Sequence, residues 1–228
     1  MNLLLLGKGK TGSLVAEMAQ ERGHEVRALG SADNANASAL TRETLGGVDV
    51  VIDFTTLQAA PQNIAACVRA GANMVVGTTG WHDQLPRVRE LVEQTDIGFL
   101  YASNFSIGVN VFFEIAQAAA DALQHGYTAK IIERHHAQKR DAPSGTASVL
   151  RRMILEKSGA ELEITSLREG DVVGTHVLLF DSANDTMMLT HDAKSRRGFA
   201  EGAVLAAEWL PGHRGFFDFK EVWRLMPR

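Results

Sequence analysis

The feature that most constrains the fold is an apolar strand, a glycine turn and a helix at the N-terminus. Residues 3–6 are consecutive leucines, as expected of a strand buried on both faces of a parallel sheet. Gly7-Lys8-Gly9-Lys10-Thr11-Gly12 follows and fits G-x-G-x-x-G, and residues 14–19 continue with helical apolar spacing. Such glycines let the backbone approach a pyrophosphate, whose charge the helix N-terminus receives. This stretch predicts a dinucleotide site, with a plain βα turn as the alternative.

The alternation of strands and helices continues through the first hundred residues. Strands are expected at 24–29, 48–54, 73–76 and 97–101, and helices at 58–70 and 82–94. This pattern predicts an α/β fold with a Rossmann-type, doubly wound parallel sheet, whose carboxyl edge binds ligands. We expect the cofactor to contact the glycine turn and also the residues that follow these strands, which together form the expected cofactor rim. The residues after the strands are Ser31, Phe54, Gly77, Thr78, Thr79, Ala102, Ser103, Asn104 and Phe105. A simple turn is the alternative for each one singly.

The sequence leaves the choice of nicotinamide cofactor open. An acid that binds the ribose is expected at the end of the second strand, where Gly30 and Ser31 stand instead. Asp33 lies slightly past that place and could equally be a turn residue. Lys8 and Lys10 could bind a 2′-phosphate or could be ordinary exposed charges. NADPH and NADH both remain candidates.

The pattern changes after a long helix that ends near Leu123. Strands are expected at 127–133, 162–167, 172–180 and 186–190, and a helix at 146–157. Strands that follow strands favour an antiparallel or mixed sheet in a second, α+β domain. The apolar runs 177–180 and 187–189 need cover, which a partner subunit could supply.

The last part of the chain could return to the first sheet. A helix at 199–210 is followed by an expected closing strand at 217–225. We therefore expect a dinucleotide-binding domain of residues 1–104 plus 197–228. Residues 105–196 would form the substrate-binding and oligomerisation domain. The chain would cross between them near Asn104 and Arg196, where a hinge could close on substrate.

The densest chemistry lies in residues 133–147, E-R-H-H-A-Q-K-R-D-A-P-S-G-T-A. His135, His136 and Lys139 precede a Pro-Ser-Gly-Thr turn in which Ser144 is placed as a helix N-cap. The amides of Gly145 and Thr146 would then offer an anion site. A proton donor, a cation and an anion cradle in one segment indicate chemistry on a small acidic substrate. A surface histidine pair beside an ordinary helix cap is the alternative.

Composition excludes several classes of protein. The formal net charge of −4 argues against a nucleic-acid-binding protein. No apolar run is long enough to span a membrane, and the N-terminus lacks the basic region of a signal peptide. Cys67 is the single cysteine, in an apolar run, so no internal disulfide can form. We expect a cytoplasmic enzyme without a metal ion.

The segment 133–147 resembles the signature of the dihydrodipicolinate reductase family, E-x-H-x-x-x-K-x-D-x-P-S-G-T-A, and matches it completely. Further family-like segments occur in the expected order over nearly the whole chain: V-G-T-T-G-W at 76–81, N-F-S-I-G-V-N at 104–110, R-E-G-D-V-V-G-T-H at 168–176 and H-D-A-K-S-R at 191–196. The glycine turn is one residue shorter than the common G-x-x-G-x-x-G form of the family.

The resemblance implies a function and a set of roles. The family reduces dihydrodipicolinate, or its 4-hydroxy-tetrahydro form, with NADH or NADPH in diaminopimelate and lysine synthesis, as a homotetramer. By motif match, His135 corresponds to the general acid and Lys139 to its cationic partner at the substrate. The remaining correspondences are to residues that hold a small dicarboxylate: His136, Ser144, Gly145, Thr146 and Arg196.

Two other functions remain possible from the sequence. Another NAD(P)-dependent enzyme, such as an amino-acid or aldehyde dehydrogenase, would be favoured by a nucleophilic cysteine. A nucleotide-binding sensor on the same fold would have no use for a proton donor. Function belongs to the site rather than to the fold, so the set around His135 favours the reductase.

Overall fold

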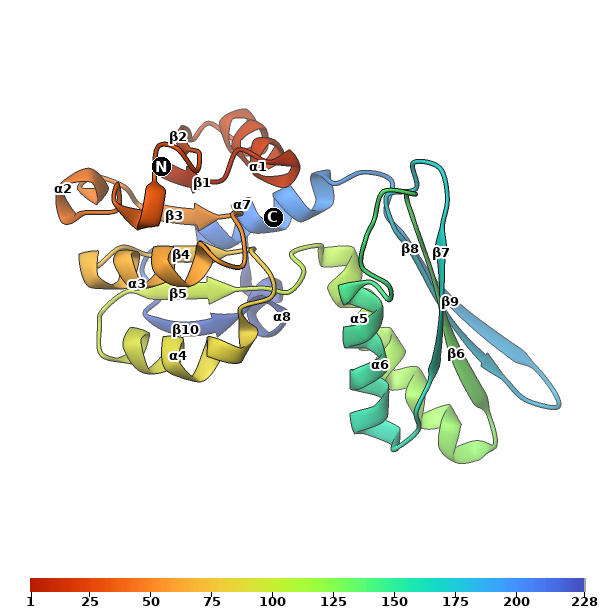
Figure 1. The fold of residues 1–228 in the computed structure, drawn as a ribbon. Coiled ribbons are helices and arrows are strands. Elements are labelled where there is room, and N and C mark those ends of the chain that lie inside the picture. Colours follow the sequence, from red (N-terminus) through yellow and green to blue (C-terminus); the bar gives the residue numbers. More distant parts are fainter. Residues whose placement is uncertain (228) are drawn as a thin grey trace. The chain divides into compact units, whose positions relative to one another are not determined.

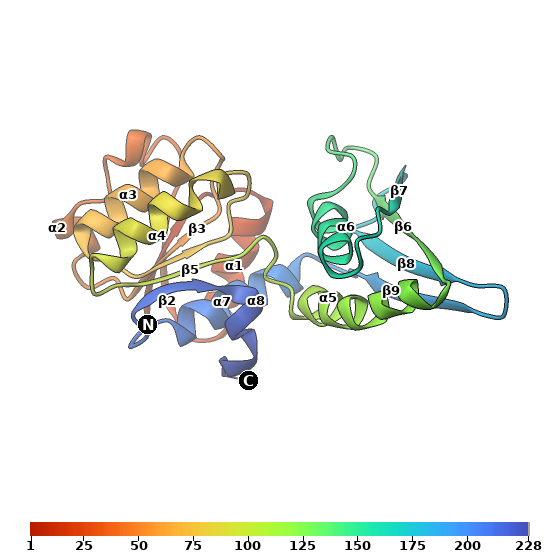
Figure 2. The same ribbon diagram turned by 90° about the horizontal axis from the view of Figure 1, so that it is seen from below.

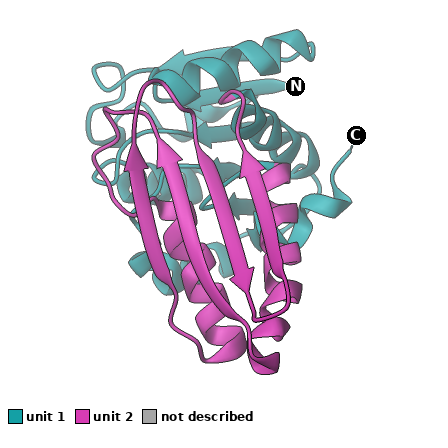
Figure 3. Cartoon of the chain, turned by 90° about the vertical axis from the view of Figure 1, so that its right-hand side faces the viewer, with its two compact units in different colours: residues 1–106, 197–228 teal, residues 107–196 magenta. Residues whose placement is uncertain are grey.

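The computed structural model describes residues 1–227, and the chain forms two units (Figure 3). Unit 1 comprises Met1–Ser106 and Arg197–Arg228, and unit 2 comprises Ile107–Arg196. Unit 1 contains a parallel sheet flanked by helices, and unit 2 contains a mixed sheet. The predicted fold class is therefore confirmed.

Unit 1 is built on six parallel strands in the order β2-β1-β3-β4-β5-β10 (Figure 1). The strands are β1 (Asn2–Leu6), β2 (Glu25–Leu29), β3 (Val50–Asp53), β4 (Met74–Val76), β5 (Gly98–Tyr101) and β10 (Gly215–Asp218). The sheet grows in one direction from β1 to β2 and in the other from β3 onward. The topological switch point, where such sheets bind ligands, therefore lies at the carboxyl ends of β1 and β3.

Helices cover both faces of this sheet (Figure 2). On one face lie α3 (Ala60–Ala70) and α4 (Leu85–Glu93), and on the other lie α1 (Lys10–Glu21) and α7 (Arg197–Trp209). Leu4 and Leu6 share a core cluster with Ile64 of α3 and Val88 of α4. Because side chains alternate along a strand, the consecutive buried leucines serve both faces. The shorter helical segments are α2 (Arg42–Leu45), α8 (Phe219–Val222), and the 3-10 turns η1 (Ala35–Ala37), η2 (His82–Gln84) and η4 (Trp223–Leu225).

The expected closing strand at 217–225 is wrong beyond Asp218. β10 is an edge strand whose one neighbour, β5, ends at Tyr101 opposite Asp218. With no partner for further ladder hydrogen bonds, the chain turns into α8, and the side chain of Asp218 caps it by accepting from the Lys220 amide. The alternation in F-D-F-K-E-V-W-R-L predicts a longer strand, but only its first two residues belong to β10.

Unit 2 is a four-stranded sheet in the order β7-β6-β8-β9, with two helices on one face (Figure 3). Its elements are α5 (Ile107–Ala119), η3 (Ala120–His125), β6 (Thr128–His135), α6 (Gly145–Ser158), β7 (Glu163–Arg168), β8 (Thr175–Asp181) and β9 (Thr186–Asp192). Ile131 and Leu178 pack with Phe113 of α5 and Leu150 of α6 in one apolar core. β6 pairs in parallel with β7 and antiparallel with β8, so the sheet is mixed, which is one of the two kinds that the sequence favoured.

Strand β6 extends further than the sequence pattern indicated. The prediction ended it at Glu133 and placed both histidines on the following loop. His135 is instead the last strand residue, because it pairs with Arg168 of β7 while Arg134 pairs with Thr175 of β8. This extension matters for the site, since it fixes His135 on a central strand rather than on a loop.

Candidate active site

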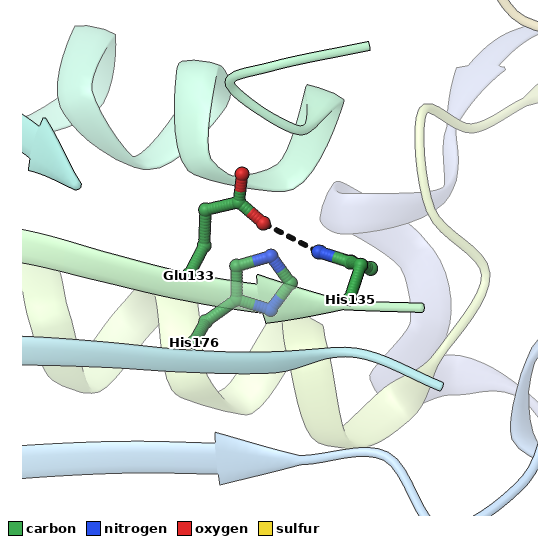
Figure 4. A group of neighbouring side chains, drawn as sticks. All are labelled: Glu133, His135 and His176. Carbon is green, nitrogen blue, oxygen red and sulfur yellow. Dashed lines mark hydrogen bonds and ion pairs between the residues drawn. The ribbon is translucent and has the colours of Figure 1, made fainter. Parts of the chain in front are cut away.

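Glu133 and His135 project from the same face of β6, because alternate strand residues share a face. Both are buried, with exposed fractions of 0% and 8%. His176 lies opposite Glu133 in the register of β8 and is 4% exposed. Figure 4 shows the three side chains converging next to the first turn of α6. A strand pair and a helix start therefore bring together groups that lie up to 43 residues apart in the sequence.

Glu133 is the hub of the hydrogen-bond network. Arg168 binds both of its carboxylate oxygens, with Nη2 at 2.7 Å from Oε1 and Nη1 at 3.0 Å from Oε2. The backbone N–H of Ser144 donates to Oε1, and Nδ1 of His135 makes a short hydrogen bond to Oε2. Burial by itself raises the pKa of Glu133, but the hydrogen bonds from Arg168 and His135 outweigh it and lower this pKa to about 2. Glu133 is therefore an anion at neutral pH.

The anionic state of Glu133 fixes the tautomer of His135. A carboxylate can only accept, so Nδ1 of His135 must carry the proton that it shares with Oε2. Nε2 is then the nitrogen that gains and loses a proton. It lies beside Gly174, where a Cβ atom would come within 2.9 Å of it. Burial lowers the pKa of His135, and the Glu133 carboxylate offsets only part of this effect.

Ser144 is the N-cap of α6, as predicted, because its Oγ accepts from the Ala147 N–H. The same Oγ lies 3.0 Å from Nε2 of His176, whose Nδ1 has no hydrogen-bond partner within residues 1–227. A buried N–H without an acceptor is rarer than a bare acceptor, so Nε2 of His176 is the donor. Burial is the main cause that lowers the pKa of His176 to about 4, which keeps this ring neutral. Ser144 then accepts twice, and its own proton is available to an incoming anion.

Further donor side chains come from the loop after β6 and from the segment between β9 and α7. Lys139 Nζ lies 2.8 Å from both carboxylate oxygens of Asp141. Nη2 of Arg196 lies 3.3 Å from Nε2 of His136. These contacts place Lys139, His136 and Arg196 in the same unit as Ser144 and the first turn of α6, which starts with Gly145 and Thr146.

The cluster also has the geometry of a possible metal site. Ligand-type atoms of Glu133, His135 and His176 lie within 4.8 Å of one another. The guanidinium of Arg168, however, already binds both oxygens of Glu133. A divalent ion would have to displace this cation or stand beside it, and either is electrostatically costly. We therefore interpret the three residues as a hydrogen-bonded network.

In unit 1 the glycine turn has the shape that a dinucleotide needs. Gly7 has a φ of +99°, and a Cβ atom there would lie 2.1 Å from the carbonyl oxygen of Phe54. A Cβ atom at Gly12 would lie 2.2 Å from the Gly7 carbonyl oxygen, so α1 packs directly against the turn. Gly9, the N-cap of α1, has no atom within 4 Å of its Cβ position. The turn is thus closed by its first and third glycines and open at its second, where a pyrophosphate would approach.

The other expected rim residues follow parallel strands and so lie along one edge of the sheet. They are Lys8, Lys10 and Thr11 in the turn, Ser31 after β2, Phe54 after β3, Gly77, Thr78 and Thr79 after β4, and Ala102, Ser103, Asn104 and Phe105 after β5. The Thr78 hydroxyl is already used, since it lies 2.6 Å from Asp53 Oδ1 and accepts from the Thr55 N–H. Thr78 can therefore offer a ligand its backbone rather than its hydroxyl.

Asp33 folds back onto the end of β2. Its Oδ2 accepts from the Gly30 N–H at 2.8 Å and from Lys8 Nζ at 2.9 Å. These two contacts, the backbone one first, lower the pKa of Asp33. The carboxylate of Asp33 therefore lies at the end of the second strand, although Asp33 is three residues beyond Gly30 in the sequence.

Sequence reasoning missed four residues of these networks: Asp53, Glu133 as a functional group, Arg168 and His176. The i, i+2 spacing of Glu133 and His135 on an expected strand was a signal that the two would share a face. Arg168 and His176 gave no local signal, because their roles depend on the pairing of β6 with β7 and β8.

Cys67 is not available as a nucleophile. It is fully buried in α3, and burial raises its pKa to about 12. The thiolate, which is the reactive form, is therefore negligible at neutral pH. Among residues 1–227 no helix is both long and apolar enough to cross a bilayer.

Comparison with known proteins gives consistent matches over nearly the full length of the chain. Residues 1–105 match the family model described as dihydrodipicolinate reductase, N-terminus, and residues 108–223 match dihydrodipicolinate reductase, C-terminus. The 4-hydroxy-tetrahydrodipicolinate reductase of Christiangramia forsetii is 41% identical, with 97% of each chain covered. That of Natronomonas pharaonis is 36% identical, covering 97% of this chain and all of the relative.

Solved structures agree on the fold. A dipicolinate-bound dihydrodipicolinate reductase from Paenisporosarcina superposes with a TM-score of 0.80 at 23% identity, covering 97% of this chain and 99% of that one. An amine dehydrogenase from Mycobacterium smegmatis superposes less closely, with a TM-score of 0.59 at 10% identity, covering 100% and 96%. At such identities these likenesses concern the architecture alone.

Proposed function

The chain belongs to the dihydrodipicolinate reductase family, and we propose that it reduces 4-hydroxy-tetrahydrodipicolinate to tetrahydrodipicolinate with NADH or NADPH. This step belongs to diaminopimelate and lysine biosynthesis, and we place it in the cytoplasm. The observation that carries the proposal is the intact set of an acid, a cation and an anion cradle on one strand, loop and helix start. These are His135, Lys139 and the Ser144-Gly145-Thr146 turn.

The substrate would be held by its two carboxylates. The Ser144 hydroxyl and the backbone at Gly145 and Thr146 form the positive end of α6, where helix N–H groups have no acceptor within the helix. Lys139, His136 and Arg196 supply further donors from the same unit. Lys139 would exchange part of its contact with Asp141, which is 58% exposed, for a substrate carboxylate.

The chemistry then follows from charge. The 4-hydroxy substrate would lose its hydroxyl and a ring hydrogen as water to give a conjugated ring, and a bound reduced nicotinamide would supply a hydride to an electron-poor carbon of that ring. Negative charge develops on the ring and its carboxylates, where Lys139 and the N-terminus of α6 stabilise it. Nε2 of His135 supplies a proton. Since an opposite charge nearby raises the pKa of a histidine, the dianionic substrate would itself favour the protonated ring.

The dinucleotide would bind unit 1, at the carboxyl edge of its sheet. The glycine turn fits a pyrophosphate, because the position above Gly9 is open and lies at the N-terminus of α1. Phe54 follows β3 at the switch point, and its ring packs on Gly77, where a Cβ atom would lie 2.3 Å from it. We propose the rim residues named above as the cofactor site.

Reductase activity is directly testable. Substrate would be generated in place from pyruvate and aspartate semialdehyde by the preceding synthase, and the loss of reduced-nicotinamide absorbance would be followed with NADH and NADPH in parallel. We expect oxidation that depends on the synthase. If the protein binds either nucleotide but oxidises neither, the reductase assignment fails and a nucleotide sensor is favoured.

We further propose that NADH is the preferred cofactor. The carboxylate of Asp33, held at the end of β2, is placed to accept hydrogen bonds from ribose hydroxyls and to repel a 2′-phosphate. Replacing Asp33 by asparagine should therefore shift the NADH-to-NADPH ratio of kcat/KM by about tenfold toward NADPH. The measurement is kcat/KM with each cofactor at one ionic strength.

Asp96, at the amino ends of the parallel strands, is a matched control for Asp33. Asp96 also forms an exposed ion pair, with Arg214 at 2.7 Å, but it precedes β5. Asp96→Asn should leave the cofactor ratio unchanged. A wild-type preference for NADPH, or an equal ratio in wild type and Asp33→Asn, would contradict the proposal.

We also propose that the protein is a homotetramer assembled through the free face of the unit 2 sheet. The helices α5 and α6 cover the other face (Figure 3). The free face carries apolar side chains that alternate with the buried ones: Ile132, Leu167, Val177, Leu179 and Met188. Met188 is 64% exposed and Leu167 is 45% exposed. Exposing this much apolar surface to water is unfavourable, and such patches commonly mark protein–protein contacts.

The proposed tetramer can be tested by placing a charged side chain on the free face of the unit 2 sheet. Leu179 lies between Lys130 and Met188 across the strands. Leu179→Glu should convert a four-chain species into smaller ones in size-exclusion chromatography with light scattering. Leu225→Glu is the control, since Leu225 is an exposed leucine of unit 1. A monomeric wild type would contradict the proposal.

A further inference from the structure

The network behind His135 has no assigned role in the chemistry proposed above. Glu133 and Arg168 do not stand among the residues that would touch substrate, and both are largely withdrawn from solvent. Side-chain exposure is 0% for Glu133 and 18% for Arg168. Burying a charged pair is favourable only with close geometry and satisfied hydrogen bonds, so this pair calls for a functional reason.

We propose that Glu133 and Arg168 are a positioning pair that holds His135 in the Nδ1–H tautomer and sets how readily its ring becomes charged. This inference rests on the proposed function in one respect, since it takes His135 as the proton donor. The effect of the pair on the orientation and charge of the His135 ring can be measured without any assay of activity.

The first step is orientation. Arg168 binds both oxygens of Glu133 and also donates to the carbonyl oxygen of Asp141 at 2.6 Å. Strand β7 therefore fixes both the carboxylate and the loop between β6 and α6. The Ser144 N–H holds Oε1 from the start of α6. The Glu133 carboxylate is thus held by its own strand β6, by Arg168 of β7 and by the start of α6. Nδ1 of His135 is hydrogen-bonded to its Oε2. A ring fixed at Nδ1 presents Nε2 for proton transfer.

The second step is charge. The groups that face His135 come from every element around it: Glu133 on β6, Arg168 on β7, His176 on β8 and Lys139 on the loop. Glu133 favours the imidazolium, while Arg168 and Lys139 oppose it. His176, neutral and 5.2 Å away by ring centroids, contributes little charge of its own. Glu133 and Arg168 therefore act in opposite directions on the same ring.

This opposition gives a test that a merely structural role would not pass. The His135 titration would be followed by nitrogen NMR of the substrate-free protein. Glu133→Gln should move its midpoint to lower pH by about one pH unit or more, because the anion is lost and Arg168 is left uncompensated. Arg168→Met should move it to higher pH. Arg168→Lys, which keeps the charge, should restore most of the wild-type value. The neutral ring should be the Nδ1–H tautomer in the wild type, and this preference should weaken in Glu133→Gln.

The control is Glu169→Gln, the same substitution one residue from Arg168. Glu169 is exposed and pairs with Arg134 at 2.9 Å, on the other face of the sheet. It should leave the His135 midpoint in place. Thermal unfolding of each variant would confirm that the titration is read from folded protein.

The outcomes separate the two claims. Midpoints that move in opposite directions support the positioning pair, and midpoints that stay fixed or move in the same direction overturn it. The pH profile of kcat tests the acid role of His135 separately. If the titrations move as expected while that profile does not, the proposed acid is wrong and the positioning pair stands.

Discussion

Replacing His135 by glutamine should lower kcat by about 10²–10⁴-fold, the usual contribution of a positioned general acid. Glutamine keeps a donor that can reach Oε2 of Glu133 and has a similar reach, so the network around Glu133 and Ser144 should persist. KM for the substrate should change little, because the carboxylate cradle at Ser144 and Lys139 is untouched. The measurement is steady-state cofactor oxidation together with cofactor affinity.

The control for this variant is His125→Gln, at an exposed histidine of the same unit. It should retain wild-type activity. A His135→Gln enzyme with more than about a tenth of wild-type kcat would show that another group delivers the proton, since a positioned acid is worth more than that.

The pH dependence of the wild type should carry the signature of the same ring. A group that acts as an acid loses its effect as pH rises through its pKa. Burial lowers the pKa of His135 in the free protein, so kcat/KM, which reports the free enzyme, should fall with a midpoint below the ordinary imidazole value of about 6.5. The dianionic substrate raises the pKa in the complex, so the midpoint for kcat should lie at higher pH. Coincident midpoints would contradict this account.

The sequence predicted what depends on short-range pattern. The strand, glycine turn and helix at the N-terminus are local, and so is the Ser144 cap of α6. The parallel, doubly wound class of the sheet follows from the alternation of strands and helices, which is also a local pattern. These features could be read because each is specified by residues that are neighbours in the chain.

What could not be read depends on register. Arg168 meets Glu133 because β7 lies beside β6 with His135 opposite Arg168, and no pattern within either strand states this. The same holds for Asp33, which reaches the end of β2 only because its turn folds back onto Gly30. The end of β10 at Asp218 is likewise set by the length of its neighbour β5. In each case the deciding partner is distant in sequence or lies in an irregular turn.

Alanine substitutions in the glycine turn should have large effects of two kinds, on stability at Gly7 and Gly12 and on cofactor binding at Gly9. Gly7→Ala should destabilise unit 1 by roughly 2–4 kcal/mol, since it adds a side chain at positive φ and forces it against backbone. The Cβ atom would lie 2.1 Å from the carbonyl oxygen of Phe54. Gly12→Ala should also destabilise, through the contact of 2.2 Å with the Gly7 carbonyl. Thermal or denaturant unfolding measures both.

Gly9→Ala should do the opposite: keep the fold and lose the cofactor. Its φ of −77° suits any residue, and its Cβ position is open, so unfolding should be unchanged. The added methyl group would stand where the pyrophosphate must approach, so cofactor affinity should fall by about 10–100-fold, the effect of 1.4–2.7 kcal/mol of lost binding. Fluorescence titration with NADH and with NADPH measures it. Because the variant is folded, a loss of binding can only come from the ligand side of the turn. Unchanged affinity for both nucleotides would mean that the turn, however well shaped, is not where the pyrophosphate binds.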